Sequence, residues 1–182
     1  MIKRCLAWCS MLAVMATLSG CASLELSAPR LDEEANKTLQ VFREEIDDGG
    51  LFLNQASGYL VFPKVIKAGL GLGAETGEGV LRVGGQTVDY YRTTSGSIGF
   101  QAGAQAKSIV IAFLTQASLD QFRKSSGWKV GIDGSIALID VGVGKTIDTD
   151  NIRDPVVGFV FGSKGLMYNL TFEGTRFTKQ VK

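Results

Sequence analysis

The sequence contains no histidine. Histidine is the usual general base near neutral pH and the commonest nitrogen ligand of zinc and copper. Serine–histidine triads and histidine-based zinc hydrolase sites are therefore excluded. We expect neither a metal nor an organic cofactor.

An excess of either charge is also missing. The 182 residues include 19 lysines and arginines against 18 aspartates and glutamates. Proteins that follow nucleic acid through its phosphates carry a broad electropositive surface, so nucleic-acid binding is not expected. Hydrophobic residues make up 45% of the chain and charged residues 20%, which is typical of a globular protein, and the length suits one domain.

Proline and cysteine are rare, whereas glycine is abundant. There are three prolines, three cysteines and 23 glycines, a composition that favours tightly packed strands. Cys5 and Cys9 lie in an N-terminal segment that we expect to be removed. The mature chain then keeps only Cys21 and can form no internal disulfide.

The N-terminal segment has the pattern of an export signal. Lys3 and Arg4 precede an uncharged, largely apolar run from Leu6 to Leu18. A membrane-spanning helix needs about 20 apolar residues, so the run is short for a transmembrane anchor and fits a signal peptide over residues 1–20. Its end, Leu18-Ser19-Gly20-Cys21, resembles the bacterial lipobox, in which the cysteine is acylated and the bond before it is cut.

The lipobox predicts a lipoprotein of a Gram-negative bacterium. Two or three acyl chains such as palmitate hold a protein durably at a membrane, whereas one chain holds it reversibly. Cys21 is followed by Ala22 and not by aspartate, which by the sorting rule of such lipoproteins favours the outer membrane. We expect the domain to face the periplasm, with exposure on the cell surface as the alternative. Residues 21–29 are expected to form a tether.

Residues 30–182 are predicted to form one α+β domain. Apolar residues at helical spacing indicate a helix that Gly49 and Gly50 should end. These apolar residues are Leu31, Ala35, Leu39, Phe42 and Ile46. The helix should pack on the domain. A further short helix is predicted from Thr115, its N-cap, to Lys124.

Period-two patterns after Tyr59 predict strands. Gly69, Gly71 and Gly73 alternate with apolar residues, so one face of that strand carries no side chains and should be approached closely. The predicted strands are 68–74, 79–83, 88–93, 97–105, 108–114, 130–141, 156–161 and 166–172. About eight short strands in a chain of this length predict a strongly curved antiparallel sheet or a small β-barrel.

Three motifs resemble functional sites without meeting their requirements. The segment 71–77 is one residue too long for a dinucleotide-binding GxGxxG, and no helix pattern follows it. The segment 143–146, VGKT, lacks the upstream glycine of a P-loop. Asp140, Asp148, Asp150 and Asp154 lack the spacing of a calcium loop, so a solvated acidic loop is expected there.

Several blocks, in order along the chain, resemble the SYLF (Ysc84-type) domain. The blocks are GYLVFPKVIKAG at 58–69, GEGVL at 77–81, Tyr90-Tyr91, SIGFQAGAQAKS at 97–108, FLT at 113–115, WKVG at 128–131, GLM at 165–167 and EGT at 173–175. The resemblance covers residues 31–182 and implies a lipid-binding module. Eukaryotic members bind phosphoinositides, and some bind actin. No SH3 or FYVE module is present here, and a bacterial envelope offers no actin. The implied ligand is therefore an anionic phospholipid or lipopolysaccharide.

Five residues are candidates for contact with such a lipid. Lys64, Lys67 and Lys107 either hold an anionic headgroup or are ordinary surface lysines that protect strand edges. Tyr90 and Tyr91 point to opposite faces of one strand, so one should lie in the core, whereas the other could lie at a lipid interface.

The expected function is lipid binding without catalysis by an outer-membrane lipoprotein. The alternative is a structural or protein-interaction component of the cell envelope, in which the same surface binds another protein. A hydrolase that uses paired carboxylates such as Glu75 and Glu78 is the third class. It lacks a partner base or nucleophile in the sequence.

Overall fold

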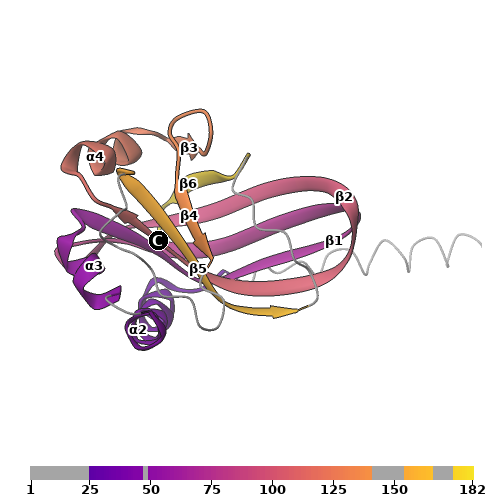
Figure 1. Ribbon diagram of the computed structural model, residues 1–182, viewed down its shortest axis with the longest axis horizontal. Coiled ribbons are helices and arrows are strands. Elements are labelled where there is room, and N and C mark those ends of the chain that lie inside the picture. The colour runs from indigo at the N-terminus through magenta and orange to yellow at the C-terminus, as the bar shows by residue number, and fades with distance from the viewer. Residues whose placement is uncertain (1–24, 47–48, 141–153, 166–173) are drawn as a thin grey trace, which may run out of the picture.

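The computed structural model describes residues 25–46, 49–140, 154–165 and 174–182 (Figure 1). Within these residues lie three helices and six strands. They are α2 (Ala28–Glu45), α3 (Gly49–Gln55), β1 (Gly58–Val83), β2 (Gln86–Phe113), α4 (Gln116–Lys124), β3 (Gly127–Lys129), β4 (Ala137–Asp140), β5 (Val156–Gly165) and β6 (Arg176–Gln180). The predicted α+β class with a strongly curved sheet is confirmed. The predicted signal segment, Cys21 and the strand at 166–172 lie outside the described residues.

The strands form one sheet in the order β3-β6-β2-β5-β4, with β1 paired to β2. β1 and β2 make a hairpin whose turn is Gly84-Gly85, with φ angles of 57° and 80° that favour glycine. The pairs are antiparallel except β4 with β5, which is parallel. The sheet is thus antiparallel, as predicted, except at this edge. A parallel pair needs a long crossover connection, and residues 141–155 separate these two strands.

β1 and β2 are much longer than any predicted strand, at 26 and 28 residues. The predicted strands at 68–74 and 79–83 are parts of β1, and those at 88–93, 97–105 and 108–114 are parts of β2. The pairing register shifts between Phe62 and Val65 and between Leu70 and Leu72. Such irregularities bend a strand and increase its twist without ending it. Figure 1 shows the hairpin curling round at the end away from the helices.

The bend brings β1 across itself, with backbone against backbone. A Cβ atom on Gly79 would lie 2.5 Å from the carbonyl oxygen of Val61, and one on Gly77 would lie 2.8 Å from that of Lys64. Near the bend, a Cβ on Gly73 would lie 2.7 Å from the Ser97 hydroxyl. The predicted close approach of backbone to side-chain-free positions is confirmed at Gly69, where a Cβ would meet the backbone of Leu72 and Gly73, and Gly77 and Gly79 extend it.

Hydrophobic cores lie on both faces of the sheet. The α2 core lies under α2 and α3 and contains Leu31, Ala35, Leu39, Phe42, Phe52, Val61, Val80, Val110 and Phe159 among others. The α4 core lies inside the curl, under α4, β3 and β6, and contains Leu60, Phe62, Val65, Tyr91, Ile109, Phe122, Trp128 and Phe177 among others. Successive residues such as Leu60 and Val61 go to opposite cores, as the period of a strand requires.

The predicted helices are present with changed boundaries. α2 packs on the domain as expected, but it begins at Ala28, inside the predicted tether, and ends at Glu45. Gly49 and Gly50 do not end a helix but begin a second one, α3, which was not predicted. α3 is stabilised because Phe52 and Leu53 are buried in the α2 core. In α4, Thr115 is the N-cap, and its hydroxyl accepts a hydrogen bond from the Ser118 N–H at 3.1 Å.

The predicted strand at 130–141 is wrong in its first half. Residues 131–133 form a turn, in which Gly131 has a φ of 85° and its N–H donates to the carbonyl of Gly134. The Asp133 carboxylate accepts a hydrogen bond from the Lys129 N–H at 2.6 Å. This local hydrogen bonding competes with strand pairing, which resumes in β4.

Replacing Gly79 by valine should destabilise the protein by about 1–3 kcal/mol, because the new side chain must displace the Val61 backbone and the Phe62 ring. Gly96→Val is the matched control, since a Cβ at Gly96 meets nothing within 4 Å. Urea unfolding of both variants measures the difference. Equal stability of the two variants would contradict the close contact between the two parts of β1.

Candidate functional site

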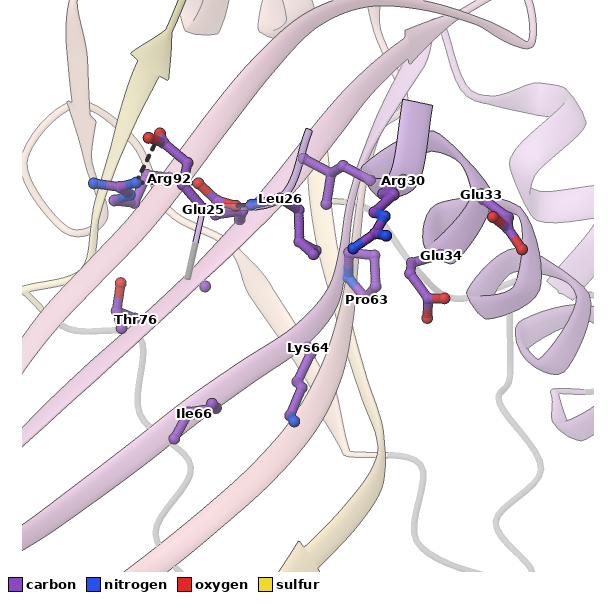
Figure 2. Close-up of a pocket in the computed structure, with 13 residues that line it drawn as sticks. Glu25, Leu26, Arg30, Glu33, Glu34, Pro63, Lys64, Ile66, Thr76 and Arg92 are labelled. Carbon is purple, nitrogen blue, oxygen red and sulfur yellow. Dashed lines mark hydrogen bonds and ion pairs between the residues drawn. The ribbon is translucent and has the colours of Figure 1, made fainter. Parts of the chain in front are cut away.

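A groove of about 800 Å³ lies beside the crossing of β1 (Figure 2). Its walls come from the start of α2, from two separate parts of β1, and from the residues just before α2. The apolar lining residues are Leu26, Leu31, Pro63 and Ile66. The crossing creates this groove, because it places 63–66 of β1 next to 76–78 of the same strand.

The outward face of β1 lines the groove. Val65 is fully buried in the α4 core, so its neighbours Lys64 and Ile66 point the other way. Ile66 is 44% exposed, which is unusual for a large aliphatic side chain in a strand between two cores. The groove therefore offers an exposed apolar surface next to a lysine.

Two of the three cations that line the groove make no ion pair with another described residue. Glu33 and Glu34 both pair with Lys37, at 2.9 and 3.0 Å. Arg92 is held between Glu25 and Glu78. Arg30 and Lys64, in contrast, make no hydrogen bond or ion pair within the described part of the chain, although Arg30 is close enough to Glu33 for its charge to help lower the pKa of that carboxyl group. The groove thus combines an apolar lining with two available positive charges.

Residues 25–27, which we call the strap, close one side of the groove. The Leu26 N–H donates to Glu78 Oε2 at 2.8 Å, and Arg92 bridges Glu25 and Glu78 at 3.0 Å each. Lys182 donates to the Leu26 carbonyl and contacts Glu78 Oε1 at 3.2 Å. Burial alone would raise the pKa of Glu78, but the bonds from Leu26, Arg92 and Lys182 outweigh it and hold that pKa below its ordinary value. Glu78 is therefore the ionised acceptor that holds the strap.

Of the three predicted lysines, only Lys64 lies at the groove. The expectation that Lys67 and Lys107 lie on the surface is wrong, since they are 5% and 4% exposed. The Lys107 ammonium lies 3.0 Å from Glu75 Oε1, and Glu75 is equally buried. Lys67 and Lys107 share the inward face of the sheet with Val65 and Ile109, two residues away along each strand, and this face lines the inside of the curl.

The two tyrosines do lie on opposite faces. Tyr91 is fully buried in the α4 core, and burial raises the pKa of its hydroxyl to about 12. Tyr90 packs on the α2 core, where its hydroxyl donates to Asp32 Oδ2 at 2.9 Å. Burial, and then this bond, raise the pKa of Tyr90. Tyr90 therefore fastens α2 to the sheet, and neither ring lines the groove.

The carboxylates considered for hydrolysis belong to separate ion-pair clusters. Glu75 pairs with Lys107 inside the curl, whereas Glu78 holds the strap. Within the described residues there is no group of three or more potential metal ligands. None of the described helices is both long and apolar enough to span a membrane.

Sequence reasoning missed three groove residues. Ile66 could have been found, because it shares a strand face with Lys64. Leu26 and Arg30 could not, because they come from the strap and α2, and only the folded chain brings those segments to β1.

Comparison with protein families gives one match. Residues 94–182 match the model of the Ysc84 family, described as "Las17-binding protein actin regulator". The match begins within β2 and runs through α4 and β3 to β6. It supports a SYLF (Ysc84-type) domain in this chain. No curated protein matches the sequence.

Replacing Lys107 by methionine should cost about 3–5 kcal/mol, because Glu75 would keep a buried charge without this partner. Lys64→Met, the matched control on an exposed lysine of the same sheet, should change stability by less than about 0.5 kcal/mol. Urea unfolding measures both. Similar costs for the two variants would show that Lys107 is not buried as described.

Replacing Glu78 by glutamine should remove about 1–2 kcal/mol at pH 7, because three donors lose a charged acceptor. A lowered folded-state pKa contributes stability above the unfolded-state pKa of about 4.3, and this contribution is lost as the pH falls through the folded-state value. The difference in the free energy of unfolding between wild type and Glu78→Gln, measured with urea, should therefore be smaller at pH 3 than at pH 7.

Glu33→Gln is the control for this experiment. The pKa of Glu33 is also lowered, first by its hydrogen bond to Lys37, but the side chain is exposed and the pair should contribute nothing measurable. If Glu78→Gln lowered the free energy of unfolding by the same amount at pH 3 as at pH 7, the charge of Glu78 would not be what stabilises the strap.

Proposed function

We propose that this chain is an outer-membrane lipoprotein of a Gram-negative bacterium whose SYLF-type domain binds anionic lipid in the groove between α2 and β1. The acylated Cys21 supplies the anchor. Binding involves no chemical step.

The observation that carries the proposal is the composition of the groove. Its volume of about 800 Å³ lies within the range of small-molecule pockets, about 300–1,000 Å³. Leu26, Pro63 and Ile66 offer apolar surface to an acyl chain. Arg30 and Lys64, which form no ion pair among the residues that the structure describes, offer two positive charges to a phosphate. An anionic amphiphile requires both kinds of surface together.

Phospholipid and lipopolysaccharide share the required chemistry, a phosphate joined to acyl chains. A cation near an anionic membrane contributes about 1 kcal/mol. The apolar stem of a lysine also lies favourably along acyl chains while its ammonium group remains in water. Lys67 and Lys107 no longer belong to the proposed site, because both are buried inside the curl. Arg30 takes their place.

A protein-binding role in the envelope is the second candidate. The family description names a protein partner, and large apolar side chains are exposed elsewhere, including Leu51 on α3 and Ile132 after β3, at 61% and 77%. These two side chains lie on separate elements and line no common groove with Ile66. We therefore favour the lipid.

The test is sedimentation of the unacylated mature chain, residues 21–182 with Cys21→Ser, with phosphatidylglycerol or phosphatidylcholine vesicles at two salt concentrations. The double variant Arg30→Glu/Lys64→Glu should weaken binding to the anionic vesicles at least about 30-fold, from two charges at about 1 kcal/mol each. What binding remains should depend less on salt.

The control is Arg43→Glu/Lys124→Glu, which changes the net charge equally at the far end of α2 and on α4. It should leave binding within about threefold. If both double variants lost the same fraction of their binding to anionic vesicles, binding would depend on the overall charge of the protein and not on the groove. If the wild-type domain bound neither vesicle and instead retained an envelope protein, the second candidate would replace the first.

A further inference from the structure

The strap, which begins four residues after Cys21, lines the edge of the groove. Leu26 and Glu25 both line the groove, and Glu78 fixes the strap through the Leu26 N–H. In Figure 2 the strap runs from the start of α2 past Leu26 to Glu25, whose carboxylate pairs with Arg92 at 3.0 Å. The chain therefore reaches the groove before it enters the first helix.

Very little chain separates the strap from Cys21. The segment from Cys21 to Glu25 spans at most about 14 Å even when fully extended. Groups attached to Cys21 therefore remain within that distance of the groove edge. An acyl chain carried there can enter the groove without release of the strap.

Tethering favours this chain over a free lipid. A short linker gives its two ends an effective concentration in the millimolar range. A free phospholipid has no such tether, so it brings an acyl chain to the groove without this gain in effective concentration. One chain of a lipoprotein can move from bilayer to groove while the remaining chains stay in the membrane, so the anchor is kept.

We propose that the groove, at rest, holds one of the protein's own acyl chains, carried by Cys21. The inference rests on the proposed function, because it needs an acylated Cys21 and a groove that accepts an acyl chain. The protein's own acyl chain covers Ile66, which is otherwise 44% exposed, and the part of Leu26 that is not already packed on the α2 core. A lipid from the membrane then enters by displacing that chain, and the two compete for one site.

The experiment uses the full lipoprotein in its own membrane. Producing cells are fed a fatty acid with a photoreactive diazirine, membranes are irradiated, and peptides of the protein are analysed by mass. The expected product is a cross-link between the acylated Cys21 peptide and the peptide that carries Ile66 or Thr76. A phospholipid adduct on those groove peptides, without the link to Cys21, would overturn the inference and leave the proposed lipid site standing.

Two further outcomes count against the proposed function itself. A mature N-terminal peptide without acyl mass would remove the anchor, and with it this inference. Acylation of Cys21 with no adduct of any kind on the groove peptides would remove the groove as a lipid site. The readouts therefore separate failure of the inference from failure of the proposed function.

Two variants tie the cross-link to the groove. Ile66→Asp places a charge on the apolar lining and should lower the yield of the Cys21 cross-link at least tenfold. Leu51→Asp makes the same change at an exposed position of α3, outside the groove, and should leave the yield unchanged. Ile66 is itself partly exposed, so the variant should fold, which its melting temperature checks. Equal yields from both variants would overturn the inference.

Discussion

The crossing of β1 over itself at Gly77 and Gly79 controls most of the structure. Neither position has room for a Cβ atom, because the carbonyl oxygens of Lys64 and Val61 would lie 2.8 and 2.5 Å away. This contact lets a single hairpin of two long strands close into a curl with a core on each face. The groove beside the crossing exists because the two halves of one strand are pressed together there.

Electrostatics in this fold follow from the two faces of the curl. The inward face buries Lys107 with Glu75, a pair that costs desolvation and therefore must remain paired. At the groove on the outward face, Arg30 and Lys64 make no ion pair within the described residues, whereas Glu33 and Glu34 of α2 both pair with Lys37. A nearly neutral chain thus presents two cations next to apolar surface, among glutamates that pair with other cations.

The fold class, the helix at α4 with its Thr115 cap, and the packing of the first helix could be predicted, because periodicity and capping act over a few residues. The lengths of β1 and β2 could not be predicted. The alternating pattern indicated separate short strands, but at Phe62/Val65 and Leu70/Leu72 the pairing register shifts and the strand bends without ending. The parallel β4 was also beyond a local pattern, because pairing direction depends on distant segments.

The sequence by itself determined a period-two face and a stripe of glycines. Only the tertiary structure decided which lysines face outward. Strict alternation from the buried Phe62 would turn Lys64 inward and Lys67 outward, but the register shift between Phe62 and Val65 reverses this. One extra residue in a strand exchanges its faces for every residue beyond it. Whether that shift occurs depends on how β1 pairs with β2 and crosses itself, and these contacts are far apart in the chain.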